Sequence, residues 1–401
     1  MLQNRILKQV AQHVRRESLP VNFELWNGEA LKFSDFPSVT VSVRSSKGLY
    51  SLIRPTLGKF ARNYVEQHID LVGGAREIMR LGESLCEASG RVAKKNFFSL
   101  NWLRHGRPDG RQAISYHYDV SNEFYGLWLD QRRIYSCAYF RCPDDSLDVA
   151  QEQKLEHVCR KLDLKENEAF LDIGCGWGGL MLWAAERHGV MADGITLSQS
   201  QYDYVRERIR VRGLGSRCRV RLMDYRDLPE TEAFDKIASI GMFEHVGRKN
   251  FPAYFGKIYR LLKPGGLVLN HGITTVRLDG GELGSDLGEF IDQYVFPGGD
   301  LAHVSAVTEA MSQQKLECWD LECLRPHYAK TLWHWVDRLE ARQEEARSIV
   351  GEARFRIWWI YMAGSAHAFE RGWLSVFQVL AAKPLANGSV PYPLTREHVY
   401  M

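Results

Sequence analysis

The stretch Phe170–Gly179, reading FLDIGCGWGG, decides the fold. Phe170, Leu171 and Ile173 have the apolar pattern of a buried parallel strand, and the segment LMLWAAERHG after the glycines reads as a helix. Glycines let the backbone approach a nucleotide-like ligand closely and adopt positive φ, and the free N–H groups at the helix start add polar donors. Asp172 comes at the end of the strand, where a carboxylate can orient an amine or a ribose of the ligand.

The spacing of the glycines separates two kinds of nucleotide site. A dinucleotide loop has G-x-G-x-x-G and an acid about 20 residues further on. Here the pattern is D-x-G-x-G-x-G-G, and the next strand, VMADGITLS, ends at Thr196 rather than at an acid. This combination resembles the S-adenosylmethionine (SAM) site of class I methyltransferases, and it favours SAM over NAD.

The composition is that of a globular protein. A chain of 401 residues with 45% apolar and 25% charged residues predicts one large domain and a smaller one. The net charge of +3 is too small to argue for a nucleic-acid partner. No apolar run approaches the length of a membrane span, and the first residues lack a signal-peptide core. The eight cysteines form no C-x-x-C pair and no zinc spacing. We therefore expect reduced thiols, no metal site and a cytoplasmic location.

The first hundred residues predict a small α+β domain. Apolar residues recur every fourth position at Leu2, Ile6, Val10 and Val14, which indicates an amphipathic helix with a basic face. Short strands are expected between 21 and 43, and a helical pattern runs from Lys47 to about Ala88 with breaks at Pro55 and Gly73–Gly74. The basic face of the first helix is either solvated, with the helix packed on this domain, or docked on an anionic membrane surface.

Residues 91–111 are basic and aromatic. The basic residues face a single acid, Asp109, and three aromatic rings lie among them. One interpretation is a solvated linker; the other is an interfacial patch, since basic groups attract anionic headgroups and aromatic rings settle at the membrane boundary. No nucleic-acid motif follows, so we expect no nucleic-acid partner. We place a basic linker at 101–111, between an N-terminal lipid- or membrane-associated domain (1–100) and a catalytic domain (112–401).

After residue 150 strands alternate with helices. QKLEHVCRKL reads as a helix, and five strands follow as FLDIG, VMADGIT, RVRLMDY, DKIASIG and GLVLNHGI, the last preceded by a KPGG turn. LECWDLECL and WLSVFQVLA read as two more. The alternation predicts an α/β fold with a mostly parallel, doubly wound sheet of seven strands. Ligands bind beyond the carboxyl ends of such strands.

The residues that follow these strands are expected to converge on one crevice. They are Thr196, Leu197, Ser198 and Gln201 after the second strand, Asp224 and Tyr225 after the third, Glu244 and His245 after the fourth, and His271, Gly272 and Ile273 at the fifth. Taken singly, each has a structural explanation, such as a helix cap or a satisfied buried histidine. Several together beside one glycine turn favour a site.

A set of motifs from about residue 112 to the C-terminus resembles the cyclopropane fatty acid synthases, including the mycolic acid cyclopropane synthases. The motifs are AISYHYDVSNEFYGLWLD, YSCAYF (135–140), LDIGCGWGG, GITLSQSQ, DYRDL, GMFEHVG, LKPGG and FPGG (296–299). YSCAYF together with MFEHVG is highly specific. The N-terminal hundred residues resemble, more loosely, the extra domain of the phospholipid-acting members. The resemblance implies the class I methyltransferase fold and methylene transfer from SAM to the cis double bond of an unsaturated phospholipid acyl chain, at the inner membrane surface.

The resemblance also assigns residues. The family's base is a bound bicarbonate, and its ligands carry over to Cys137, Glu244, His271 and Tyr328, with the backbone at Ile273. For SAM it points to Tyr135 and Ser136 near the methionine end, and to Asp172, Gly174 and Gly176 at the turn. Thr196, Leu197 and Gln201 would lie near the ribose, and Asp224 and Tyr225 near adenine. The late aromatic residues, among them Trp333, Trp335 and Phe369, are expected as core or as the wall of an acyl channel rather than as partners of a cation.

Two positions depart from the family pattern. Ser365 stands where some members have a further cysteine near the bicarbonate. Asp193 lies inside the second strand, where it either reaches the ribose or ends the buried face of the strand. Three alternatives stay open: a related acyl methyltransferase that leaves a methylene or methyl branch, a small-molecule N-methyltransferase, and a lipid-binding protein without activity. The oligomeric state, with a homodimer among the options, is also open.

Overall fold

A computed structural model describes residues 2–52, 55–88, 121–231, 233–278, 285–295 and 300–400. By packing, the chain divides into two units. Unit 1 comprises Met1–Gly106, Glu282–Pro297 and Val336–Ala368, and unit 2 comprises Arg107–Gly281, Gly298–Trp335 and Phe369–Met401. The expected linker at 101–111 lies outside the described residues, and the division into 1–100 and 112–401 stays a prediction. Unit 1 contains segments from both sides of that linker.

Unit 2 contains the expected sheet of seven strands, in the order β10-β11-β9-β8-β5-β6-β7. The strands are β5 (Ala169–Ile173), β6 (Met191–Thr196), β7 (Cys218–Leu222), β8 (Phe234–Ile240), β9 (Leu262–Thr275), β10 (Glu317–Cys323) and β11 (Leu374–Ala382). Strands β5 to β9 pair in parallel, and β11 pairs antiparallel with both β9 and β10. The predicted fold class is confirmed. The KPGG segment, expected as a turn, is part of β9, with Gly265 at φ +81°.

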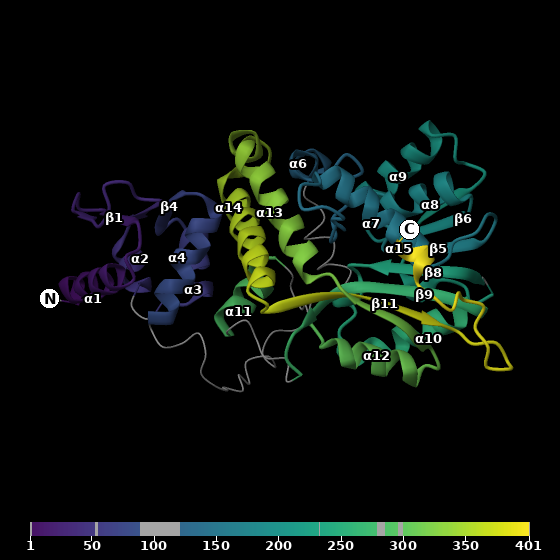
Figure 1. Cartoon of the computed structure of the whole chain (residues 1–401). Helices are drawn as coiled ribbons and strands as arrows, with labels where there is room; N and C mark the ends of the chain where they lie inside the picture. Colours follow the sequence, from purple (N-terminus) through teal and green to yellow (C-terminus); the bar gives the residue numbers. More distant parts are fainter. Residues whose placement is uncertain are drawn as a thin grey trace. The chain divides into compact units, whose positions relative to one another are not determined.

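Helices cover both faces of this sheet (Figure 1). Helices α7 (Leu147–Lys161), α8 (Gly179–His188) and α9 (Gln199–Val211) lie on one face, and α10 (Phe251–Leu261) and α12 (Val304–Gln313) lie on the other. Each face has its own apolar core. Phe170 belongs to the first core and Leu171 to the second, because successive side chains of a strand point to opposite faces. The near-continuous apolar strands read from the sequence are therefore buried on both sides.

The remaining elements of unit 2 border the carboxyl ends of the strands or close the chain. They are α6 (Asn122–Trp128), the 3₁₀ turns η2 (Tyr225–Asp227), η3 (Phe243–His245) and η4 (Arg248–Asn250), the first part of α13 (Arg325–Ala341), and α15 (Glu397–Tyr400). Local chemistry sets several helix ends. Ser146 and Ser198 accept hydrogen bonds from backbone N–H groups at the starts of α7 and α9, and Gly189 ends α8 in the left-handed conformation.

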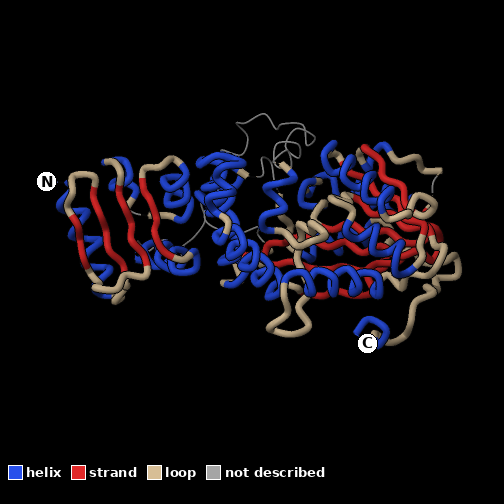
Figure 2. The backbone as a smooth tube through the Cα atoms, turned by 90° about the horizontal axis from the view of Figure 1, so that it is seen from above, coloured by secondary structure: helices blue, strands red, loops and turns tan. Residues whose placement is uncertain are grey.

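Unit 1 has a four-stranded sheet in the order β2-β1-β3-β4, whose strands lie side by side in Figure 2. Its elements are α1 (Leu2–Arg16), β1 (Val21–Leu25), β2 (Ala30–Lys32), β3 (Val39–Val43), α2 (Ser46–Ser51), α3 (Leu57–Val65), β4 (Ile69–Gly73), α4 (Ala75–Ala88), α11 (Ser285–Tyr294), the last part of α13 and α14 (Gln343–Glu370) up to Ala368. The helical pattern expected from Lys47 to Ala88 is wrong at β4, which pairs antiparallel with β3. Val10 and Val14 of α1 are buried within this unit.

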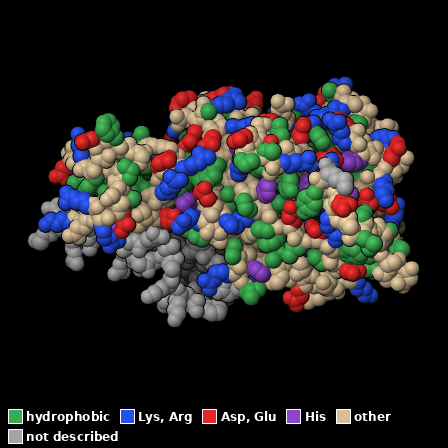
Figure 3. Space-filling model, viewed as in Figure 1, with side chains coloured by type: hydrophobic (Ala, Val, Ile, Leu, Met, Phe, Trp, Pro, Cys, Tyr) green, Lys and Arg blue, Asp and Glu red, His purple; other side chains and the backbone are tan. Residues whose placement is uncertain are grey.

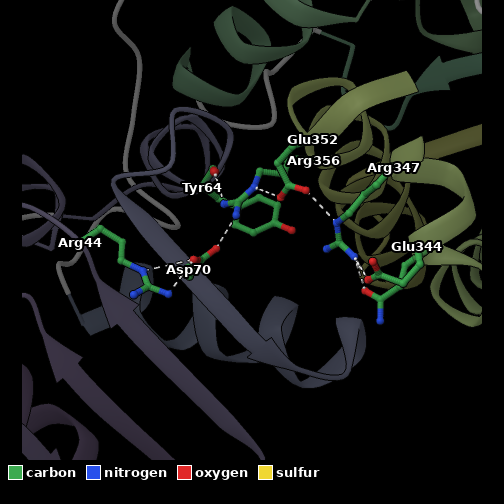
Figure 4. Close-up of polar contacts among 8 residues, drawn as sticks. Arg44, Tyr64, Asp70, Glu344, Arg347, Glu352 and Arg356 are labelled. Atoms are coloured by element: carbon green, nitrogen blue, oxygen red, sulfur yellow. Dashed lines mark hydrogen bonds and ion pairs between the residues drawn. The ribbon is translucent and has the colours of Figure 1, made fainter. Parts of the chain in front are cut away.

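An ionic network holds α14 against the N-terminal segments within unit 1 (Figure 4). The guanidinium of Arg356 donates to the Tyr64 carbonyl (3.0 Å), to Asp70 (2.6 Å) and to Glu352 (2.5 Å). Burial raises the pKa of Tyr64 to about 12, so its hydroxyl stays protonated beside these charges. Gly351, at φ +78°, kinks α14 just before this network. Residues nearly 300 positions apart thus join one packing unit.

The surface shows no large field of one sign on the face drawn in Figure 3, where basic and acidic side chains are interspersed. Among the described residues, no helix has the length and apolar character needed to cross a membrane.

Candidate active site

The glycine turn of unit 2 leaves space at the end of β5. Gly174, Gly176 and Gly178 adopt φ of +78°, +55° and +82°, which only glycine accepts without strain. A Cβ at Gly174 would press on Met242 and one at Gly178 on Val205, whereas a Cβ at Gly176 would meet no atom within 4 Å. The turn is therefore packed at two glycines and open at the middle one, which is where a ligand can approach the backbone.

Asp172 lies beside this turn with an unsatisfied carboxylate oxygen. Its side chain is buried, and Oδ2 has no hydrogen-bond partner among the described residues. Burial raises the pKa of Asp172 to about 7, although the charge of Lys154 and a backbone hydrogen bond from Met181 act to lower it. A buried acceptor without a donor costs free energy. An amine or hydroxyl of a ligand would satisfy it, so these residues fit SAM.

The residues after β6 and β7 are held by one another. Thr196 donates from Oγ1 to Oε1 of Gln201 (2.7 Å), which fixes the orientation of that amide. Leu197, the next residue after Thr196, is half-buried. Asp224 accepts a two-point ion pair from Arg226 (2.9 and 2.7 Å) and also its backbone N–H. Burial raises the pKa of Tyr225, whose ring meets Tyr254 edge to face at 5.2 Å. Their ribose and adenine roles stay predictions.

We call the strand side of the site the group formed by Glu244, His271, Gly272 and Ile273. Glu244 lies in η3 directly after β8, and its Oε1 accepts a hydrogen bond of 2.7 Å from the backbone N–H of Ile273 on β9. Its Oε2 is buried without a partner among the described residues. Burial raises the pKa of Glu244 to about 7, against the lowering effect of the Ile273 bond. Two residues predicted together are thus brought together.

Gly272 makes this contact possible. A Cβ at this position would overlap the ring of Phe243, and it would lie 3.1 Å from Oε1 of Glu244. Only a residue without a side chain lets η3 lie flat on β9. The sequence requirement at this point is therefore steric, since Gly272 does not have a positive φ.

His271 is buried on β9, an interior strand of the sheet. Its Nδ1 lies 3.3 Å from Nε2 of Gln378, its register partner on β11. Burial, with the charges of Lys154 and Lys161, lowers the pKa of His271 to about 3, so the ring is neutral at pH 7. Gln378 is fully buried, and its Oε1 has no partner among the described residues. Sequence reasoning missed Gln378, although a glutamine inside an apolar strand is a usable signal.

We call the loop side the irregular segment 134–140, which carries Tyr135, Ser136 and Cys137. Cys137 is buried, with Sγ 3.8 Å from the carbonyl of Leu324, the residue before α13. Burial raises the pKa of its thiol far above the ordinary value, so the group is a neutral thiol. The next residue, Ala138, donates its N–H to Oγ1 of Thr331 on α13 (3.0 Å).

Tyr135 and Tyr328 share an aromatic neighbour. The ring of Trp335 lies 5.2 Å from Tyr135 and 6.1 Å from Tyr328, and Tyr328 also meets Phe369 at 4.7 Å. Trp128 adds a further face to Tyr135 at 5.5 Å. Trp335 and Phe369 are therefore buried among other rings, and their role as the wall of an acyl channel stays a prediction. Tyr328 lies on α13, the helix whose Thr331 holds Ala138 next to Cys137.

A buried polar stripe on α7, which sequence reasoning missed, contacts the loop side and acts electrostatically on the strand side. The stripe consists of Gln151, Lys154, His157 and Lys161, each at most 1% exposed. Gln151 donates to the Ser136 carbonyl (2.9 Å), Lys154 donates to Ser136 Oγ (2.9 Å), and Lys161 contacts Asp320 and Glu322. The charge of Lys154 acts on both Cys137 and His271. The signal was present as polar residues at spacings of three, three and four, which share one helix face.

The two departures from the family pattern receive different answers. Both oxygens of Asp193 bind Arg219 (2.8 and 2.6 Å) on the adjacent strand, and Arg221 adds a third contact (3.1 Å). Asp193 is therefore an ion-pair partner of β7, and neither alternative offered for it describes this role. Ser365 lies on α14 in unit 1, and its suggested role stays a prediction. The AISYHYDV and FPGG motifs lie outside the described residues.

Known proteins of one family match this chain along most of its length. The family model described as mycolic acid cyclopropane synthetase matches residues 106–379. A probable fatty acid methyltransferase of Pseudomonas putida is 43% identical over 395 residues, covering 98% of this chain and 100% of the relative. The cyclopropane-fatty-acyl-phospholipid synthase of Escherichia coli K12 is 34% identical over 298 residues, 74% of each chain. The crystal structure of mycolic acid cyclopropane synthase CmaA1 with SAH and CTAB has 33% identity and a TM-score of 0.64, covering 69% of this chain and 99% of that one.

Proposed function

Because the chain belongs to the mycolic acid cyclopropane synthetase family of SAM-dependent methyltransferases, we propose that it adds a methylene from SAM across the cis double bond of unsaturated phospholipid acyl chains. The observation that carries this proposal is the state of Glu244. One carboxylate oxygen is fixed by the Ile273 N–H, and the other is buried and lacks a partner among the described residues. A carboxyl kept this way is suited to hold a small proton-accepting group in a dry site.

The reaction sets demands that the site must meet. An isolated alkene is a weak nucleophile, so the sulfonium methyl must be held in line with it. One C–C bond forms as the S–CH₃ bond breaks, which leaves a carbocation on the acyl chain. Loss of a proton from the new methyl closes the second C–C bond of the ring. Water must be excluded, or it would add to the cation, and the apolar wall around Trp335 serves this exclusion.

Bicarbonate, when bound, supplies the base that accepts this proton, and we propose Cys137, Glu244, His271, Tyr328 and the Ile273 backbone as its holders. A carboxylate beside an anion would repel it, but the pKa of Glu244, raised by burial to about 7, makes the protonated form accessible. The Cys137 thiol and the His271 ring are both neutral. Neutral thiol, imidazole and phenol groups are hydrogen-bond donors that suit an anion.

A second product is supported by one comparison. The Pseudomonas putida relative aligns along 98% of this chain and is named only as a probable fatty acid methyltransferase. The same carbocation yields a methylene-branched chain if the proton leaves without ring closure. A methyl branch needs a reductant in addition. The geometry at Glu244 is compatible with both the cyclopropane and the methylene product. Only analysis of the product therefore distinguishes the two reactions.

The test is incubation of the full-length protein with vesicles of unsaturated phospholipid and labelled SAM. We expect label in the acyl chains, with cyclopropane signals by NMR after the chains are released. Because the cyclopropane and the methylene product have the same mass, NMR or fragmentation is needed. Vesicles of saturated phospholipid are the matched control. Label confined to a soluble amine would contradict the proposal and favour an N-methyltransferase.

We further propose contact with an anionic membrane surface through the basic segment 91–111, which lies outside the described residues. Neutralising Arg104 and Arg107 should weaken binding to anionic vesicles and reduce its salt dependence. Arg206 and Arg210, exposed on α9 and paired with acids of their own helix, are a matched control pair. Equal loss from both pairs would assign the effect to net charge alone. A homodimer also stays a proposal, which sedimentation velocity tests.

A further inference from the structure

Lys154 is an ammonium group buried at the centre of the candidate site. It is 1% exposed, and its Nζ donates to Ser136 Oγ at 2.9 Å. Among the described residues it forms no ion pair, although Lys161 on the same helix face forms two. A buried charge without a close counter-charge is costly, and burial lowers the pKa of Lys154 to about 8 despite the nearby Asp130 and Asp172. Lys154 is therefore a buried cation that donates to a neutral hydroxyl and that forms no ion pair with a carboxylate among the described residues.

Ser136 is the residue to which Lys154 donates its hydrogen bond. Its carbonyl accepts from Gln151 and its Oγ accepts from Lys154, so α7 holds the residue at two atoms. A serine hydroxyl has one hydrogen to donate. Because the lone pair faces Lys154, that hydrogen turns away from α7. Ser136 is half-buried whereas Lys154 is fully buried, so Ser136 is the member of the pair that keeps accessible surface for a ligand.

We propose that Lys154 is the counter-charge for the methionine carboxylate of SAM and acts on it through the Ser136 hydroxyl. This inference rests on one part of the proposed function, namely that SAM is the co-substrate. The same ligand carries an ammonium group beside its carboxylate, and the unsatisfied Oδ2 of Asp172 offers an acceptor for it. Lys154 and Asp172 also act on each other electrostatically. Lys154 and Asp172 thus match the carboxylate and the ammonium group of the methionine part of SAM.

Two other roles for Lys154 lead to different measurements. A lysine that only braces the loop would support Cys137 and Ser136 without regard to the ligand's charge. A lysine that serves bicarbonate would act on turnover and its bicarbonate dependence and leave SAM binding unchanged. The hydrogen bond from Lys154 favours a role in SAM binding. It goes to Ser136, which is expected near SAM, and not to Cys137, which is expected near bicarbonate.

The experiment compares two ligands by calorimetry on the full-length protein: SAM, and decarboxylated SAM, which differs only in lacking the carboxylate. We expect Lys154→Met to weaken SAM binding by about ten- to a hundredfold and decarboxylated SAM by less than about threefold. Lys154→Arg should restore most of the SAM affinity. Ser136→Ala should lower the preference for SAM similarly, and the double variant should add little, since the two residues act as one unit.

The control is Lys161→Gln, which alters the same helix face but a lysine already paired with Asp320 and Glu322. It should leave the ratio of the two affinities unchanged. If Lys154→Met does not fold, as judged by its thermal melt, Ser136→Ala carries the test alone. Equal weakening of both ligands, or an unchanged ratio in Ser136→Ala, overturns the inference. Lipid turnover is not part of this readout, so failure to label lipid would count against the proposed function only.

Discussion

The strand side and the loop side of the site are built by different physical means. Glu244, His271 and Ile273 are placed by the parallel pairing of β8 with β9 and by the bond from the Ile273 N–H. Tyr135, Ser136 and Cys137 lie on a segment without regular structure, which Gln151, Lys154 and Thr331 hold through side-chain hydrogen bonds. A sheet distributes its constraint over many backbone bonds. A loop depends on the hydrogen bonds of a few side chains. Substituting one of these side chains should therefore weaken ligand binding before it lowers the stability of the fold.

We expect the largest effect from a substitution on the strand side, at Glu244. Glu244→Gln keeps the shape of the side chain and removes its ability to share a proton. We expect turnover to fall by about 10²- to 10⁴-fold, while SAM affinity changes little because the residue belongs to the strand side. Calorimetry and labelled-lipid assays measure the two effects. Glu309→Gln, on the exposed face of α12, is the control, and near-normal turnover in Glu244→Gln would end the assignment.

Gly272 tests whether the strand side tolerates any adjustment. Gly272→Ala places a methyl group inside the ring of Phe243, and overpacking of this kind destabilises by about 3 kcal/mol. Urea unfolding measures the loss. Gly215→Ala is the matched control, because a Cβ there meets no atom within 4 Å and Gly215 does not have a positive φ. A stable, active Gly272→Ala protein would show that η3 is not fixed against β9.

The pH dependence of stability separates the ionisable part of the strand side from its packing. Burial raises the pKa of Glu244 from 4.5 to about 7, so the folded state binds this proton more tightly than the unfolded state. The associated stability is present at low pH and is lost as pH rises through about 7. Relative to Glu244→Gln, the native protein should lose about 2 kcal/mol between pH 5 and pH 8. Parallel curves for the two proteins would contradict the buried state of this carboxyl.

Thr331 gives the smallest expected effect and sharpens the loop side. Thr331→Val removes the acceptor for the Ala138 N–H (3.0 Å) and leaves a buried donor unsatisfied. We expect a loss of about 1–2 kcal/mol in unfolding free energy together with a raised KM for SAM. Thr331→Ser keeps the hydroxyl and is the matched control. If the serine and valine variants bind SAM equally, the loop does not depend on this bond.

Much of the fold was readable because its signals are local. A buried parallel strand is a short apolar run, and the glycines of the turn mark positive φ within six residues. Glu244, His271 and Ile273 could be grouped because each follows or ends a strand, and strand ends meet at one edge. β4 was missed because IDLV is a short run that ends in two glycines inside an otherwise helical region.

The polar contacts between distant segments could not be predicted in this way. Lys161 and Asp320 lie 159 residues apart, and His157 and Glu322 lie 165 apart, so periodicity cannot reveal that one satisfies the other. The role of Asp193 depended on the register that sets it opposite Arg219. The contact between Gln378 and His271 depends on the antiparallel register of β11 against β9, although the glutamine itself was a visible signal. In each case the missing information was a pairing between distant residues.

The interrupted course of the chain through unit 1 affects how the protein is made. Arg356 and Trp359, which cover Tyr64 and Asp70, are translated nearly 300 residues after the segment they cover. We therefore expect this surface of the N-terminal segment to stay uncovered during translation until α14 has been made. A truncated gene encoding only the first hundred residues would leave the same surface bare, and its product should be a target for chaperones and proteases.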